Sequence, residues 1–245
     1  MKVNSNHSDP RDLYTQTELQ QAFKVFDSEI YPNDESIMCS IHDSFHKEDD
    51  KAHNCIGCNF ADYTQLLHTA LQNVTVTAPI EAFSATILYS YLLIERFEEI
   101  FKIIKLPDSY RLRHFQVFGQ IRRWANFLKH PKAFMLVHHP EYYFENEITI
   151  EPGDEKTHII IDQKFVDEYY SGDKENNKLF SLLSNKKNVV VLLPTLDKLI
   201  ADFCVGQKKF IDIISNNEVF RELLDEKSTM KNYFEGETDD INNAK

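Results

Sequence analysis

The chain has 245 residues, of which 42% are hydrophobic, 27% are charged and six are glycine. This composition is ordinary for a globular protein and excludes collagen, rod-like coiled coils and a fully disordered chain. With 27 Lys and Arg against 39 Asp and Glu, the formal net charge is −12. Nucleic acid or an anionic membrane can therefore be bound only through a local basic patch.

The N-terminus gives no sign of export. Its first 21 residues are polar and lack the apolar run of a secretory signal. The most apolar stretch, residues 82–94, is shorter than the about 20 residues that span a bilayer. Four cysteines do not make a disulfide framework, and three of them fall between positions 39 and 58. We expect a cytoplasmic protein with no membrane segment.

Composition and hydrophobic pattern divide the chain into four segments: 1–62, 63–145, 146–235 and 236–245. The first is polar and contains one expected amphipathic helix, Leu19–Ile30, followed by a cluster of cysteines and histidines. The second is strongly helical, the third mixes short β-type runs with helices, and the last is an acidic tail.

Two close pairs of potential metal ligands lie in the first segment. Cys39 and His42 form one pair, and Cys55 and Cys58 form the other after twelve intervening residues. This spacing is typical of a tetrahedral zinc site, and four protein ligands would make the zinc structural. Free thiols in a polar loop, or a redox or open metal site, are the alternatives. The histidine ligand is ambiguous because two more histidines lie nearby, His46 and His53.

Between Pro79 and Leu106, apolar residues recur at spacings of three and four, with Ser90 as the single polar member of the row. This predicts one long helix with a stripe facing the core: Ile80, Phe83, Ile87, Ile94, Phe97, Phe101 and Ile104. Pro107 ends this helix, and a second helix is expected over 109–130. The short connection predicts that the two helices are antiparallel.

Short β-type runs follow Pro131, at 147–150, 158–162 and 189–193, and helices are expected over 195–215 and 218–227. A turn-like Pro-Gly-Asp sequence separates the first two runs. We therefore expect an α+β, mainly helical fold: a helical bundle core with a small appended antiparallel sheet and a zinc-knuckle-like N-terminal segment. Three acids after the second run read as a solvated strand exit more readily than as a metal site: Asp162, Asp167 and Glu168.

A polar row follows one side of the second expected helix. At about 100° per residue, Arg123 and His130 differ by about 20° around the helix axis, and Asn126 lies between them. Pro131 places His130 near the C-terminus of the helix, where the dipole favours the protonated imidazole. We take Arg123, Asn126 and His130 as candidate catalytic residues.

The same region concentrates positive charge in an acidic protein. Residues 105–132 contain seven Lys and Arg and a single acid, Asp108. Such a stretch can attract a phosphodiester, which makes RNA a candidate partner, or it can dock on the protein's own acidic surface. Three carboxylates of the preceding helix are placed to pair with its arginines: Glu95, Glu98 and Glu99.

The Arg123-x6-His130 element on an apolar helical hairpin resembles the Arg-x4–6-His motif of HEPN domains (higher eukaryotes and prokaryotes nucleotide-binding). These are small helical bundles common in bacterial toxin–antitoxin and antiphage systems, and the resemblance covers residues 63–145. It implies a metal-independent endoribonuclease that acts as a homodimer and uses the 2′-hydroxyl of RNA as nucleophile. It also implies that His130 transfers the proton and that Arg123 stabilises charge on the phosphate.

The alternative from another class is a non-catalytic, zinc-stabilised helical scaffold that binds a protein partner. In that case the basic helix pairs with acidic surface, whereas a ribonuclease needs it exposed. A zinc-dependent enzyme is a third possibility, but it requires an open coordination position that the count of Cys and His ligands does not favour.

Overall fold

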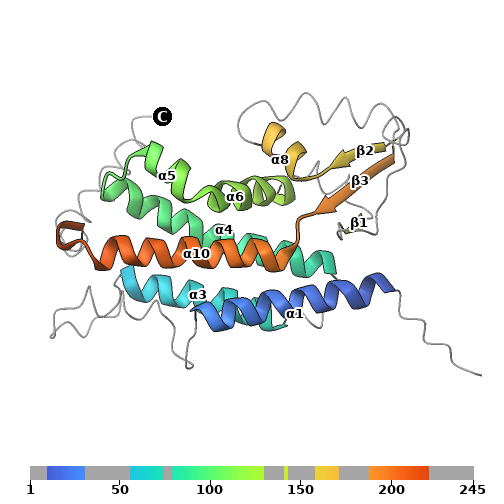
Figure 1. Cartoon of the computed structure of the whole chain (residues 1–245), viewed down its shortest axis with the longest axis horizontal. Coiled ribbons are helices and arrows are strands. Elements are labelled where there is room, and N and C mark those ends of the chain that lie inside the picture. Colours follow the sequence, from blue (N-terminus) through green and yellow to red (C-terminus); the bar gives the residue numbers. More distant parts are fainter. Residues whose placement is uncertain are drawn as a thin grey trace, which may run out of the picture.

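The computed structural model describes residues 10–30, 56–73, 79–129, 141–142, 158–170 and 188–220 (Figure 1). Its elements in chain order are α1 (Pro10–Ile30), α3 (Ile56–Asn73), α4 (Pro79–Ile103), α5 (Asp108–His114), α6 (Gln116–Lys129), β1 (Glu141–Tyr142), β2 (His158–Ile161), α8 (Gln163–Tyr169), β3 (Asn188–Leu193) and α10 (Leu196–Ser215). The expectation of a mainly helical fold with a small sheet is confirmed.

The long helices form a bundle in which α10 packs against α1 and α6, while α3 packs against α1 and α4, and α4 packs against α6 (Figure 1). Phe97 of α4 lies at its centre. Its ring centroid is 5.1 Å from that of Phe60 in α3, 5.2 Å from Phe118 in α6 and 4.4 Å from Phe210 in α10. Stacked and tilted aromatic pairs of this kind stabilise a core beyond the area that they bury.

Helix α1 is longer than the expected Leu19–Ile30 and belongs to the same core. It packs along α10, and Ala22, Phe26 and Ile30 are completely buried. The described core therefore draws on residues from three of the four sequence segments.

Helix α4 confirms the predicted stripe, since its described members from Phe83 to Ile104 are buried. The helix is followed by a residue in the left-handed region, Lys105, with φ 53°. The amide of Leu106 then donates to the carbonyl of Phe101 at 2.8 Å, as in a Schellman cap. Helices commonly use glycine at this position because a Cβ is disfavoured there.

The second expected helix is two helices, α5 and α6, that meet at Phe115. There the backbone leaves the helical region, with φ −127° and ψ 41°, and the amide of Phe118 donates to the carbonyl of Phe115. The break lets the Phe115 side chain turn into the core, where it is 4% exposed and its ring centroid lies 4.8 Å from that of Phe101. After the break, α6 runs antiparallel to α4, as predicted (Figure 1).

The sheet is parallel, so the expectation of an antiparallel sheet is wrong. Its strand order is β1-β3-β2, and both β1 and β2 run parallel to β3. The connection between β2 and β3 includes α8, a helix that the sequence did not reveal. Asp162 caps it by accepting a 2.8 Å hydrogen bond from the amide of Phe165. Parallel neighbours need such a crossover, whereas antiparallel strands can be joined by a turn.

Some of the other predicted helices and strands are confirmed, and others lie outside the described residues. Helix α10, preceded by Thr195, matches the helix expected at 195–215, and β2 and β3 match two of the three β-type runs. The run at 147–150, and the expected helix beyond residue 220, lie outside the described residues. Within the described ranges, every helix is too short or too polar to cross a bilayer.

Candidate functional site

The structure places part of the predicted site. Arg123 and Asn126 lie on α6, which ends at Lys129, and His130 lies outside the described residues. The same holds for Cys39, His42 and Cys55, and for His46 and His53. Cys58 lies in the first turn of α3, but its side chain is outside the description. Among the side chains that are described, no group of three or more His, Cys, Asp or Glu could hold a metal ion.

Arg123 is joined to α8 by a chain of hydrogen bonds. Its Nε donates to Oδ1 of Asp167 at 2.6 Å, and Nε2 of Gln163 donates to the same oxygen at 2.8 Å. Oε1 of Gln163 in turn accepts the indole N–H of Trp124 at 2.8 Å. Trp124 is completely buried and makes edge-on contacts with the rings of two other core residues, Phe83 and Phe127. The carboxylate that meets Arg123 is thus tied to the core.

The guanidinium of Arg123 lies over Gly119, one turn earlier on α6. A Cβ at position 119 would be 3.3 Å from Nη1 of Arg123, so the glycine leaves room for the group. The Arg123 side chain is 26% exposed. Among the described residues Asp167 is its hydrogen-bond partner, through Nε, and both terminal nitrogens are without one. The edge formed by these two nitrogens can bind a phosphate bidentately.

Asn126 and Lys129 continue this side of α6 towards its C-terminus. Asn126 is half-buried. The Lys129 ammonium sits 3.7 Å from the ring centroid of Tyr91 on α4, a cation–π contact that holds the last residue of the helix against the bundle. The end of α6 is thereby fixed directly before His130.

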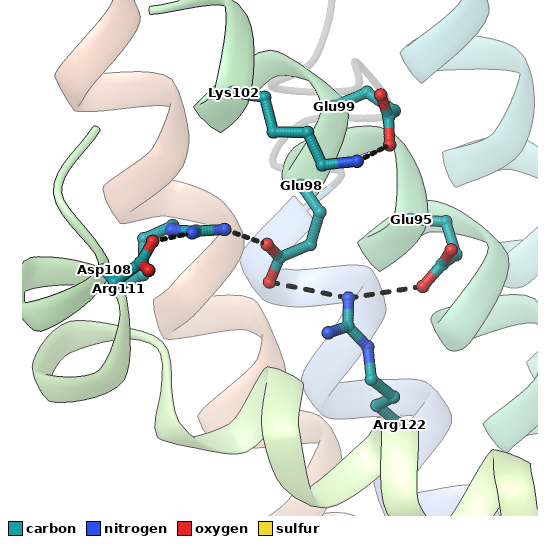
Figure 2. Close-up of polar contacts among 7 residues, drawn as sticks. All are labelled: Glu95, Glu98, Glu99, Lys102, Asp108, Arg111 and Arg122. Atoms are coloured by element: carbon teal, nitrogen blue, oxygen red, sulfur yellow. Dashed lines mark hydrogen bonds and ion pairs between the residues drawn. The ribbon is translucent and has the colours of Figure 1, made fainter. Parts of the chain in front are cut away.

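Two more arginines of the basic stretch, Arg111 and Arg122, are paired within the bundle (Figure 2). Glu98 of α4 accepts from Arg111 at 2.5 Å and lies 3.6 Å from Arg122, which also reaches Glu95 at 3.3 Å. Arg111 also pairs with Asp108, its neighbour in α5. The predicted pairing with α4 is confirmed for Glu95 and Glu98, whereas Glu99 pairs with Lys102 of its own helix at 2.6 Å.

This pairing reduces the charge available to a ligand. Arg111, Arg122 and Arg123 all have carboxylate partners, and Lys129 faces an aromatic ring. Two exposed cations of the stretch, Lys105 and Arg113, are outside every described ion pair. Among the described residues, this stretch therefore offers an anion no continuous basic helix face.

The pKa values of Arg111 and His114 are shifted in opposite directions. Burial tends to lower the pKa of Arg111, but its two carboxylate partners outweigh burial and raise that pKa. Desolvation and the positive charges of Lys209 and Arg113 lower the pKa of His114. Nζ of Lys209 is 2.7 Å from Nδ1 of His114, a contact that requires the ring nitrogen to be an acceptor. The contact with Lys209 thus fits a neutral imidazole at His114.

Sequence reasoning missed Gln163 and Asp167. It interpreted Asp167 as a solvated acid at a strand exit, and the structure instead shows it on α8 in contact with Arg123. A signal was present: Asp162 stands three residues before Phe165 as a helix cap, and Gln163 and Asp167 are four apart on one helical face.

Comparisons with protein-family models, with curated proteins and with solved structures give no match for this chain.

Proposed function

We propose that this chain is a HEPN-like, metal-independent endoribonuclease that cleaves RNA with Arg123 and His130, of the kind found in bacterial toxin or antiphage systems. The observation that carries the proposal is the geometry of Arg123. Its guanidinium is held through one N–H by Asp167, and its two terminal nitrogens have no partner among the described residues. An arginine oriented in this way is suited to a phosphodiester.

The proposed reaction needs two tasks from the protein. A base removes the proton of the RNA 2′-hydroxyl, whose oxygen attacks the adjacent phosphorus, and the bond from phosphorus to the 5′-oxygen breaks. The leaving oxygen takes up a proton, and the products are a 2′,3′-cyclic phosphate and a 5′-hydroxyl. His130 carries out the proton transfer because imidazole titrates near neutral pH. Arg123 stabilises the charge on the phosphoryl oxygens, and Asn126 is placed to add a hydrogen bond on the same side of α6.

The resemblance to HEPN domains adds a homodimer to the proposal, with two copies of the motif meeting at one interface. It also leaves the first segment free for a structural role. We propose that Cys39, His42, Cys55 and Cys58 bind one structural zinc. Their residue types and spacing support this, since two thiolate- or imidazole-bearing pairs separated by a loop can enclose a tetrahedral ion. Zinc content of the purified protein and of a Cys58→Ser variant tests this proposal.

The test of the ribonuclease is RNA cleavage by the purified protein in buffer without Mg²⁺, with and without EDTA. Wild type is compared with Arg123→Ala and His130→Ala, and circular dichroism verifies the fold in each buffer. Arg113→Ala is the matched control, because it removes the same charge from an exposed arginine outside every described ion pair. Loss of cleavage in the first two folded variants alone supports the proposal. Cleavage unaffected by His130→Ala refutes the mechanism.

The second candidate is a non-catalytic scaffold that binds another protein. A specific observation favours it: Arg111 and Arg122 pair with carboxylates of α4, so the basic stretch serves partly to hold the bundle together. The absence of cleavage by wild type over a broad RNA panel would leave this candidate in place of the ribonuclease.

A further inference from the structure

We infer that Asp167 is a positioning residue that orients Arg123 for a phosphate ligand, so that α8 is part of the candidate site. The inference rests on the proposed function and extends the site beyond the helical hairpin that carries the motif. Arg123 and Asp167 are 44 residues apart in the chain, on α6 and α8.

The first support is that the carboxylate is itself fixed. Oδ1 of Asp167 accepts a hydrogen bond from the side-chain amide of Gln163. The side-chain oxygen of Gln163, Oε1, in turn accepts the indole N–H of Trp124. Trp124 is 0% exposed, whereas Asp167 is 41% exposed at the other end of the chain of bonds. Rigid supporting hydrogen bonds of this kind are what hold a functional side chain in one geometry.

The second support is that the Asp167 carboxylate contacts Nε of Arg123 and neither terminal nitrogen. It contacts Nε at 2.6 Å, on the inner side of the guanidinium, and Gly119 makes room for Nη1. A carboxylate on the terminal edge, formed by Nη1 and Nη2, would compete directly with a phosphate for those two nitrogens. The observed contact leaves that edge for a ligand, as a positioning role requires.

If only the charge of Asp167 mattered, its removal would favour phosphate binding, whereas the positioning role predicts a loss of function. The two expectations differ in sign, so an experiment can separate them. Asp167 is an anion, so its removal should increase affinity for phosphate if the carboxylate only competes with the ligand. If its role is to orient the guanidinium, removal should impair catalysis although the local charge becomes more positive. Asp167→Asn separates the two effects because the amide oxygen still accepts from Nε while the charge is lost.

The experiment measures kcat and KM for RNA cleavage by wild type, Asp167→Ala and Asp167→Asn. The matched control is Glu168→Ala, which removes the same charge from the next, exposed residue of α8. We expect Asp167→Ala to lower kcat by about 10- to 100-fold, the range found when the hydrogen-bond partner of a metal ligand is lost. We expect Asp167→Asn and the control to stay within about threefold of wild type. Unfolding in urea, recorded in parallel, verifies that the loss of kcat is not a loss of folded protein.

Trp124 supplies a readout that does not depend on cleavage, because it is the single tryptophan of the chain and belongs to the hydrogen-bonded chain. We expect its fluorescence to respond to a non-cleavable 2′-O-methyl RNA in wild type and Asp167→Asn, and to lose that response in Asp167→Ala. Wild type that responds in this pattern but does not cleave RNA refutes the proposed function and supports the positioning role. Asp167→Ala that cleaves or binds as well as wild type, or a wild type with neither activity nor response, overturns the inference.

Discussion

Glu98→Gln should test how the basic stretch is held, because Glu98 joins α4 to both α5 and α6 (Figure 2). Its side chain is 17% exposed, and its Oε2 accepts from Arg111 at 2.5 Å. A hydrogen bond to a charged group in such a half-buried place contributes about 1.5–3 kcal/mol. Part of this survives in the variant, since glutamine still offers an acceptor and Arg111 keeps Asp108.

The contact with Arg122 adds less. It is 3.6 Å long and the Arg122 side chain is 40% exposed, so it contributes a few tenths of a kcal/mol, about the value for a surface pair. We therefore expect Glu98→Gln to lower the free energy of unfolding by about 1–2 kcal/mol, below the full value of the Arg111 bond. The assay is urea unfolding followed by circular dichroism, in which the midpoint falls and the slope stays constant.

The matched control is Glu99→Gln, on the same turn of α4. Its ion pair with Lys102 joins side chains that are 41% and 55% exposed, so its loss should cost about 0.5 kcal/mol or less. Equal destabilisation by the two variants would refute the reasoning, because it would mean that the contacts to Arg111 and Arg122 contribute no more than an exposed pair.

Three other predictions concern the bundle. Lys105→Gly should raise the free energy of unfolding by about 0.5–1 kcal/mol in the same urea assay, because glycine adopts the positive φ of this cap without strain; a lower stability contradicts the cap. Gly206→Ala should destabilise by about 1–3 kcal/mol despite the better helix propensity, because the new Cβ would lie 2.8 Å from a ring carbon of buried Phe118; a thermal melt at or above the wild-type temperature contradicts this packing. Burial raises the pKa of Cys204 to about 12 from 9.0, so iodoacetamide should label this thiol at pH 8 only after unfolding. The contribution of the protonated thiol to folding stability should be full below about pH 9 and should be lost as the pH rises towards 12. Peptide mapping that finds Cys204 labelled in the folded protein contradicts the burial.

The sequence predicted the elements whose pattern is local and long. The stripe on α4 runs along nearly the whole helix, and α10 is a long helical run, so both helices were found close to their observed bounds. The break at Phe115 was missed because no glycine or proline marks it. The helical pattern continues through that position, and burial of the Phe115 ring decides the backbone there.

The direction of the sheet and the partner of Arg123 were missed for a related reason. Helix α8 has seven residues, too few for a clear periodic signal, yet it lies in the connection between the parallel strands β2 and β3. It also carries Asp167, which meets Arg123 through a contact between distant segments. Spacing along the chain identified Arg123 and Asn126 as neighbours on one helix, but a contact across 44 residues follows from tertiary packing alone.

The most direct test of the proposed ribonuclease is the chemistry of its products. An RNA oligonucleotide and the same sequence with a single 2′-deoxy residue at the cleavage position are incubated with the wild-type protein in buffer without divalent cations, and the product ends are identified by mass spectrometry. The account predicts cleavage of the all-ribose strand to a 2′,3′-cyclic phosphate and a 5′-hydroxyl, and no cleavage at the deoxy position. Cleavage at the deoxy position, or products that carry a 5′-phosphate, would contradict attack by the 2′-hydroxyl and with it the roles assigned to Arg123 and His130.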